Sequence, residues 1–278
     1  MMKVAIIGLG LIGGSLGLEF SKNHCVYGLD NNQKHEELAL QLGLISATIP
    51  FEKLHEMDAV VIAVPVDKIP NVTKEVLDSI TDKTLVFDVG SIKENVCNSI
   101  KNHVNRKQFL ATHPIAGTEF SGPNAAVKNL FTNKVNIICE KQLTDTKQFE
   151  KFIHIMGSIP MRYVFMASAK QHDKHIAYVS HLSHISSFML GKTVLEIEKE
   201  EETIFNMAGS GFESTVRLAK SSPNTWTPIF LQNKKHIINS LDEYINNLQD
   251  FKKMLQKSEQ ENIYNSLKET NRIKEILP

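Results

Sequence analysis

The sequence is poor in the residues that secreted and low-complexity proteins use most. Its 278 residues include three cysteines, Cys25, Cys97 and Cys139, which are far apart and odd in number. This number and spacing exclude a disulfide framework and a zinc knuckle, so we expect a reducing, cytoplasmic setting. Glycine and proline make up about 8% of the chain, below the usual ~12%, which excludes collagen-like and disordered classes.

The chain also lacks a net charge and a long apolar run. Lys and Arg number 31, as do Asp and Glu, so the formal net charge is zero. A neutral chain has no overall field that attracts nucleic acid or an anionic membrane, and we expect neither as a partner. The apolar run from Val4 to Leu18 is too short to span a bilayer, and it contains five glycines and no following cleavage site of a signal peptide.

What the sequence does have, over its first half, is an alternation of short apolar segments and helical patterns. Strands are expected at 3–7, 25–29, 59–64, 84–87, 108–111, 135–139 and 162–165. Helices are expected at 13–21, 33–42, 71–80, 92–102 and 144–155. The strands are not strictly alternating, as is typical of strands buried on both faces, and their alternation with helices predicts a parallel sheet with helices on both faces.

Beyond about Ser168 the periodicity becomes helical. Six apolar residues between Ile237 and Leu255 recur at intervals of 4, 3, 4, 3 and 4, a heptad-like stripe that fits either a core-facing or a dimer-forming helix. The charged segment 257–278 is expected to be a surface helix with a loose end. We therefore predict an α/β Rossmann-type domain over residues 1–165 and an all-α domain over residues 166–278.

A glycine motif directly follows the first expected strand. Gly8 permits a tight turn, Gly10 lets the backbone approach a pyrophosphate, and Gly13 lets the next helix pack closely on the strand. Leu11 and Ile12 lie within this motif, just before the expected helix, and are predicted to contact the cofactor; the free N–H groups and positive dipole end of that helix suit phosphates. The motif in this strand–turn–helix context predicts a dinucleotide site.

Asp30 ends the second expected strand, twenty residues after Gly10. An acid at this position can accept hydrogen bonds from a ribose diol, and it would repel a 2′-phosphate. Alone it would be an ordinary turn residue, but with the glycine motif it predicts NAD, rather than NADP, as the cofactor.

Ligands of an open parallel sheet bind beyond the carboxyl ends of its strands. Histidine takes up and releases a proton near neutral pH, so His113 suits an alcohol oxidation, although it could also simply be a polar residue finishing a strand. Ser91 begins a Ser-x-x-Glu capping box, which predicts that it caps a helix. The residues expected to gather near the nicotinamide are Ala63, Val64, Pro65, Gly90, Ser91 and His113.

Four histidines lie close together further along the chain. They are His172, His175, His181 and His184, with Asp173 beside the first. No Cys or Glu completes an obvious zinc ligand set, so we predict no metal site. The cluster fits the lining of an anion or hydroxyl pocket, or scattered surface histidines.

Arg217 follows two glycines, Gly209 and Gly211, which open an expected helix. Its guanidinium offers a planar, permanently charged fork for carboxylates, although a helix-face arginine that reaches water fits the same spacing. Trp226, the sole tryptophan, is expected to pack in a core or an interface.

Taken together, these segments resemble the prephenate dehydrogenases of tyrosine biosynthesis, from residue 3 to about 240. The segments are GLGLIGGSLG at the start, DVGSIKE at 88–94, HPIAGTEFSG at 113–122, HD at 172–173, SHLSH at 180–184 and GSGFESTVRLAKSSPNTW at 209–226. The resemblance implies a nucleotide-binding domain, a helical domain that builds a homodimer, and NAD-dependent oxidative decarboxylation of prephenate to 4-hydroxyphenylpyruvate, CO2 and NADH. Arogenate is the alternative substrate.

The resemblance also implies a role for individual residues. His113 resembles the histidine that takes the proton of the ring hydroxyl, and Ser91 the serine that orients it. Arg217 resembles the arginine that binds a substrate carboxylate. The remaining substrate-binding residues that it implies are Thr118, Glu119, which gates the site, and Ser180, His181 and His184 on the helical side of the pocket.

One position departs from the family pattern. Related chains often carry an acid three residues before the arginine, where this chain has Ser214 with Glu213 beside it. Two other functions also fit parts of the sequence. A 3-hydroxyacid dehydrogenase shares the first motif and the overall plan, and a non-catalytic NAD sensor would keep the glycines without needing Ser91, His113 and Arg217.

Overall fold

The computed structural model describes residues 1–118, 120–201 and 203–276. The chain divides into two compact units, Met1–Asn233 and Lys234–Pro278.

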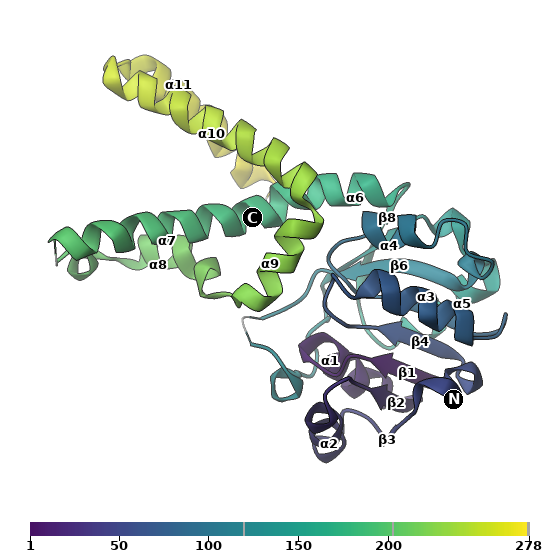
Figure 1. Ribbon diagram of the computed structural model, residues 1–278. Coiled ribbons are helices and arrows are strands. Elements are labelled where there is room, and N and C mark those ends of the chain that lie inside the picture. The colour runs from purple at the N-terminus through teal and green to yellow at the C-terminus, as the bar shows by residue number, and fades with distance from the viewer. Residues whose placement is uncertain (119, 202, 277–278) are drawn as a thin grey trace. The chain divides into compact units, whose positions relative to one another are not determined.

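The first unit is built on one eight-stranded sheet with the strand order β3-β2-β1-β4-β5-β6-β7-β8 (Figure 1). All neighbouring strands are parallel except β6 and β7. The strands are β1 (Lys3–Ile7), β2 (Cys25–Leu29), β3 (Ala47–Thr48), β4 (Ala59–Ile62), β5 (Leu85–Asp88), β6 (Phe109–Pro114), β7 (Val135–Cys139) and β8 (Arg162–Met166). The seven expected strands are confirmed, and the two-residue β3 was missed.

The expectation of an entirely parallel sheet is wrong at β7. A parallel return needs a crossover that carries the chain back across the sheet, usually as a helix. Between β6 and β7 the described residues form only the short 3₁₀ turn η3 (Pro123–Ala125), so the chain turns back alongside β6 in the opposite direction. The helix α5 (Thr146–Met156) then supplies the crossover that makes β8 parallel to β7.

Helices cover both faces of the sheet, as predicted. On one face α1 (Leu11–Phe20), α2 (Gln33–Gln41) and α5 pack against side chains such as Phe87. On the other, the 3₁₀ helix η1 (Phe51–Glu56), α3 (Ile69–Ser79) and α4 (Glu94–Ser99) pack against neighbours such as Val86. Because both faces are buried, all four residues of β4 are apolar and inaccessible, which explains the continuous apolar runs in the sequence. Short 3₁₀ turns complete this part, η2 (Arg106–Gln108) and η4 (Lys141–Leu143).

The rest of the first unit is helical, as the change of periodicity predicted. It contains α6 (Ala169–Ile176), η5 (Ala177–His181), α7 (Leu182–Glu201), η6 (Ile204–Met207), α8 (Ser210–Val216), η7 (Arg217–Lys220) and α9 (Pro223–Gln232). Of these, η5 is a single π-helical turn between α6 and α7. Such turns are frequent at functional sites, because the extra residue re-aims the side chains around it.

The second unit is a helical hairpin. Its long helix α10 (Lys234–Gln256) carries the whole heptad-like stripe, and α11 (Gln260–Thr270) runs back beside α10 after a turn in which Ser258 has a φ of 56° (Figure 1). The short turn η8 (Asn271–Glu275) follows. The expected helix in the charged segment is thus confirmed from Gln260 to Glu275, and the expected loose end at 277–278 lies outside the described residues. Among the described residues, no helix is long and apolar enough to cross a membrane.

Candidate active site

In the glycine loop between β1 and α1, a side chain would find room at one of the three motif glycines and would clash with the backbone at the other two. Gly8 has a φ of 95°, and a Cβ there would lie 2.6 Å from the carbonyl oxygen of Ala63. A Cβ at Gly13 would lie 1.9 Å from the carbonyl oxygen of Gly8. At Gly10 a Cβ would meet no atom within 4 Å. The loop therefore leaves open only the position at which a pyrophosphate is expected to approach.

The start of α1 suits an anion. The helix begins at Leu11, its N-cap is Gly10, and no side chain caps it. No acidic residue lies in the first turn, so the N–H groups of Leu11, Ile12 and Gly13 and the positive end of the helix dipole can face a phosphate. These features fit the pyrophosphate of NAD.

Asp30 lies directly beside this loop. Its Oδ2 accepts a 2.8 Å hydrogen bond from the N–H of Leu9, and its Oδ1 accepts a 2.9 Å bond from the N–H of Asn32. The backbone N–H of Asp30 donates to the Glu36 carboxylate at 2.9 Å. Asp30 thus fixes the glycine loop to the end of β2, and its predicted contact with a ribose diol would use the remaining lone pairs of the same carboxylate.

The other predicted cofactor residues follow neighbouring strands at the same edge of the sheet. After β4, Ala63 and Val64 are half-buried and Pro65 is exposed. After β5, Gly90 is buried and donates its N–H to Asp88 Oδ2 at 3.0 Å. Since β1, β4, β5 and β6 are consecutive in the sheet, the structure brings these segments, the glycine loop and the end of β6 together.

The prediction that Ser91 caps a helix is wrong. The helix α4 starts only at Glu94, with Lys93 as its N-cap residue. Asp173, at the middle of α6, takes this role instead: its Oδ1 and Oδ2 accept the N–H groups of Lys93 and Glu94 at 2.9 and 2.8 Å. Ser91 is half-buried, and within the described part of the chain its hydroxyl has no hydrogen-bond partner, His113 included.

His113 is buried in β6 and belongs to a chain of hydrogen bonds. Its Nδ1 lies 2.9 Å from Nε2 of His172, whose Nδ1 lies 2.7 Å from Asp173 Oδ1. Burial is the main cause that holds the pKa of His113 well below its usual range, and the electrostatic effects of His172, Lys93 and His181 act in the same direction. The imidazole is therefore neutral at pH 7 and can accept a proton.

A buried ion pair lies directly behind this histidine. Lys93 is fully buried, and its ammonium pairs with Asp88 and donates to the carbonyl oxygen of Thr112 at 2.7 Å. The pair ties the end of β5 to the residue that precedes His113. Sequence reasoning missed Lys93 because no spacing rule singles out one lysine whose partners lie on separate strands.

The helical side of the site is arranged around Trp226. The His184 ring stacks on the Trp226 ring with centroids 3.4 Å apart, and His181 meets the same ring edge-on at 6.1 Å. Nδ1 of His184 donates to the Ser180 carbonyl oxygen at 3.0 Å. The tryptophan is half-buried, so it packs against both histidines while part of its surface stays accessible to solvent.

Asn233 joins the two sides of the site. Its Nδ2 donates to the carbonyl oxygen of Asp173 at 2.8 Å and lies 3.1 Å from Nδ1 of His181. Burial lowers the pKa of His181 to about 4, so this ring is also neutral at pH 7. Sequence reasoning missed Asn233, because its partners lie 60 and 52 residues away along the chain.

Arg217 is exposed and lies one residue beyond the helix that was expected to carry it. The helix α8 ends at Val216, and Arg217 begins the 3₁₀ turn η7. Burial lowers the pKa of His184, the bond to the Ser180 carbonyl opposes this effect, and the charge of Arg217 adds to it. The turn η7 that begins with Arg217 packs against α7, which carries His184, because the N–H of Ala219 donates to Ser187 Oγ at 3.1 Å. In the part of the chain that the structure describes, no acidic side chain pairs with it, and Glu213 lies 4.0 Å from Lys220 instead.

The structure does not join every predicted residue to this site. Thr118 is exposed, and its hydroxyl accepts the N–H of Phe120 at 3.3 Å. Glu119 lies outside the described residues. Within those residues, no group of three or more His, Cys, Asp or Glu side chains is placed to hold a metal ion.

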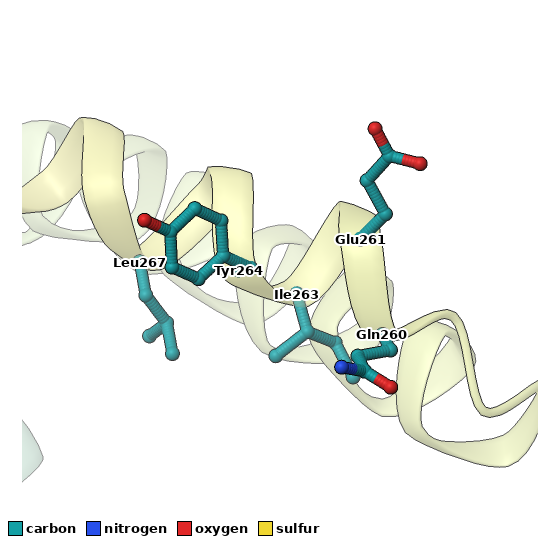
Figure 2. Close-up of a pocket in the computed structure, with 5 residues that line it drawn as sticks. All are labelled: Gln260, Glu261, Ile263, Tyr264 and Leu267. Atoms are coloured by element: carbon teal, nitrogen blue, oxygen red, sulfur yellow. The ribbon is translucent and has the colours of Figure 1, made fainter.

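A surface hollow of about 640 Å³ lies elsewhere, on α11 of the second unit. Figure 2 shows the side chain of Glu261 extending away from Ile263 and Leu267. The hollow is lined by Gln260, Glu261, Ile263, Tyr264 and Leu267. It contains no histidine and no cation, and we assign it no part in catalysis.

Comparison with known proteins decides the family. Residues 17–164 match the nucleotide-binding domain of prephenate dehydrogenase, and residues 168–269 match its dimerization domain. The chain belongs to the prephenate dehydrogenase family. It is accordingly an NAD-dependent oxidoreductase with an α/β domain and a helical domain, as the sequence predicted. The glycine motif at 8–13 precedes the matched range, so its geometry is independent support.

Individual relatives agree with this family. Prephenate dehydrogenase of Bacillus subtilis is 31% identical over 99% of this chain and 76% of its own length. Cyclohexadienyl dehydrogenase of Zymomonas mobilis is 27% identical over 97% of this chain and 94% of its own length. The crystal structure of Aquifex aeolicus prephenate dehydrogenase with hydroxyphenyl propionate and NAD+ matches with a TM-score of 0.91 and 28% identity, and covers 100% of this chain and 99% of that one.

Proposed function

We propose that this enzyme oxidises and decarboxylates prephenate to 4-hydroxyphenylpyruvate and CO2, with reduction of NAD to NADH. The observation that carries the proposal is His113, a buried neutral imidazole at the end of β6, on the same sheet edge as the glycine loop. The names of the Bacillus subtilis and Aquifex aeolicus relatives support the choice of substrate.

His113 manages a single proton in this reaction. When bound, NAD accepts the hydride from the ring carbon that bears the hydroxyl. Nε2 of His113 takes the hydroxyl proton as the C–O bond becomes a carbonyl, the ring carboxylate leaves as CO2, and its electron pair enters the ring. The resulting phenolate oxygen takes the proton back, so His113 ends neutral and no net proton is released.

The helical side of the site supplies substrate binding. Prephenate carries two carboxylates, and a partly dry cleft needs a fixed cation to hold one of them. Arg217 has no competing acid among the described residues, and the His184–Trp226 stack beside it offers a flat surface to the ring. We place Ser91, Ser180 and His181 at the same pocket, with Thr118 and Glu119 contributing from the loop after β6.

The proposal extends to domains, assembly and location. We assign cofactor binding to residues 1–165 and substrate binding and dimerisation to residues 166–278, with a homodimer as the active form. The match of residues 168–269 to a dimerization domain supports this division. We place the enzyme in the cytoplasm, since its three cysteines are unpaired.

Arogenate is the second candidate substrate. It carries an amino group where prephenate has the keto group of the side chain, and the cyclohexadienyl dehydrogenase of Zymomonas mobilis has a name that covers both compounds. The position three residues before Arg217 is Ser214, whose hydroxyl donates to the Gly211 carbonyl oxygen at 2.9 Å. The acid that related chains often carry there is absent from this position, which favours the keto substrate.

A spectrophotometric assay of NADH formation tests the function. We expect turnover with prephenate and NAD, one CO2 per NADH, and a lower kcat/KM with arogenate. A 3-hydroxyacid tested in parallel should give no NADH. Turnover of the hydroxyacid instead, or NAD binding with no turnover of either cyclohexadienyl substrate, would overturn the proposal.

A further inference from the structure

His172 and Asp173 lie behind the predicted base. Both side chains are buried, at 1% exposure each, and the three groups form a line from His113 Nδ1 to His172 Nε2 and from His172 Nδ1 to Asp173 Oδ1. Neither residue has a role in the mechanism above. Two neighbouring polar residues seldom stay buried unless all their hydrogen bonds are satisfied.

The line fixes which nitrogen of each ring carries a proton. A carboxylate only accepts hydrogen bonds, so Nδ1 of His172 must donate to Asp173. A neutral imidazole has one N–H, and therefore Nε2 of His172 is an acceptor. It can be satisfied only if Nδ1 of His113 donates to it. The lone pair of His113 then sits on Nε2, the nitrogen that points away from this line.

Asp173 is itself held in place from three directions. Its two carboxylate oxygens accept the N–H groups of Lys93 and Glu94 at the start of α4, and its carbonyl oxygen accepts Nδ2 of Asn233. The carboxylate therefore has little freedom to turn away from His172. This rigidity is the property that a positioning group for a catalytic base needs.

We propose that His172 and Asp173 are positioning residues, which hold His113 as the Nδ1–H tautomer with Nε2 free to take the substrate proton. The proposal rests on the function proposed above. It gives the pair no part in carrying the proton away, because that proton returns to the product phenolate. While His113 is protonated, its Nδ1–H bond to His172 remains and the Asp173 carboxylate lies one ring away from the positive charge.

The surrounding charges agree with neutral rings. His113 and His172 are faced by the Lys93 ammonium beside α4, by Asp88 at the end of β5, by Asp173 on α6 and by His181 on η5. Burial lowers the pKa of His172, and Asp173 only partly offsets this effect. If His172 were protonated, both of its ring nitrogens would carry a proton, and it could not accept the hydrogen bond from Nδ1 of His113. The tautomer described therefore requires a neutral His172.

Nitrogen-15 NMR of histidine-labelled full-length enzyme tests the tautomer directly, with or without NAD. We expect His113 to show a protonated Nδ1 and an unprotonated Nε2 at pH 7.5. The protonated nitrogen being Nε2 would overturn the proposal, whatever the substrate turns out to be. Failure of the proposed function is a separate result, namely that the unsubstituted enzyme does not turn over prephenate.

Kinetics of His172→Asn and His172→Gln test the consequence. The shorter amide cannot reach Nδ1 of His113, so we expect kcat to fall by at least about 10-fold, up to the 10²–10⁴-fold worth of a general base, with KM for prephenate and NAD changed little. The Gln oxygen can replace Nε2 of His172 as acceptor, and we expect it to restore part of kcat and the Nδ1–H signal of His113. The matched control is His175→Asn, an exposed histidine on the same helix.

The melting temperature and circular dichroism of each variant separate positioning from folding. Loss of kcat in His172→Asn with partial rescue in His172→Gln supports the proposal. Unchanged kcat and an unchanged His113 tautomer in His172→Asn would refute it. If His172→Asn does not fold, the tautomer in the unsubstituted enzyme and the kinetics of His172→Gln decide. The reference is His113→Asn, a variant that lacks the base altogether: a kcat of His172→Gln as low as that of His113→Asn would also contradict the acceptor role.

Discussion

His113 can act as a base only in its unprotonated form, and its lowered pKa decides the pH at which that form is lost. A histidine whose pKa lies below 6.5 is neutral throughout the neutral range, so activity falls only as the pH drops through that lower pKa. We expect kcat/KM for prephenate to be flat from neutral pH through pH 6.5 and to decline only at a pH well below 6.5.

Replacing this histidine removes the base. His113→Asn should lower kcat by about 10²–10⁴-fold, the usual worth of a general base, with a much smaller change in KM. The acid limb of the pH profile should also disappear, because asparagine does not titrate. His175→Asn, on an exposed histidine, is the control. A variant with near-native kcat would show that another residue, such as His184, is the base.

Arg217 allows a second test at the scale of one residue. A charge-assisted hydrogen bond to a carboxylate contributes about 1.5–3 kcal/mol, so Arg217→Ala should raise KM for prephenate by about 10- to 150-fold, with a smaller fall in kcat. KM for NAD should not change, and Arg217→Lys should restore binding only in part.

The control for Arg217 is Lys220→Ala, another exposed cation of the same 3₁₀ turn. Arg217 is exposed and no acidic side chain of the described chain pairs with it, so its loss should leave the melting temperature unchanged. A lower melting temperature with native kinetics would mean that the arginine is structural.

Site residues that are marked by a local sequence motif or by the end of a strand could be predicted from the sequence. Site residues that are held by partners far away along the chain were missed. Gly8, Gly13 and His113 lie where the motif and the strand end placed them. Lys93 and Asn233 were missed because each contacts groups on several separate elements. A capping box considers only residues that are close in sequence. It gave the wrong cap for α4, because the carboxylate of Asp173, which is distant in sequence, accepts the N–H groups at the start of that helix.

At the scale of the element, the strands were predicted well because burial on both faces makes them continuous apolar runs. The residues of a strand do not determine whether it runs parallel or antiparallel to its neighbours. Apart from Asn136, β7 is apolar like the parallel strands of the sheet, and its direction follows from the short connection before it, which has no crossover helix among the described residues. A π-helical turn such as η5 likewise cannot be predicted from the spacing of apolar residues, because it adds a single residue to an otherwise helical pattern.

The β1–α1 element predicts opposite effects for two glycines of one motif. A methyl group at Gly13 would clash with the carbonyl oxygen of Gly8, and we expect Gly13→Ala to cost roughly 1–3 kcal/mol of unfolding free energy or more. A methyl group at Gly10 meets no protein atom within 4 Å, so Gly10→Ala should keep the native stability. It should instead raise KM for NAD by at least about 10-fold, since the pyrophosphate must approach the backbone there.

Thermal unfolding and NAD titration of the two variants check this pair. Each variant is the control for the other, because both add one methyl group to the same loop. The interpretation of the loop would be wrong if Gly10→Ala melted lower than Gly13→Ala, or if it bound NAD normally.

At the scale of the whole molecule, the helix α10 has more apolar surface than one chain covers. Leu248 and Leu255 belong to the heptad-like stripe and are 53% and 57% exposed. A stripe with this spacing is typical of a helix that packs against another helix, and the range that contains it matches a dimerization domain. A second copy of the chain is therefore the partner that we expect on this stripe.

Light scattering after size exclusion at micromolar concentration should give twice the 31.3 kDa mass of the chain. Two buried aspartates would leave unpaired charges in an apolar interface, so Leu248→Asp with Leu255→Asp should shift the enzyme to monomer. Asn246→Asp with Asn247→Asp adds the same two charges to exposed positions of α10 outside the stripe, and this variant should remain a dimer. A fully active monomer of the unsubstituted chain at this concentration would show that the stripe serves another purpose and that catalysis needs only one chain.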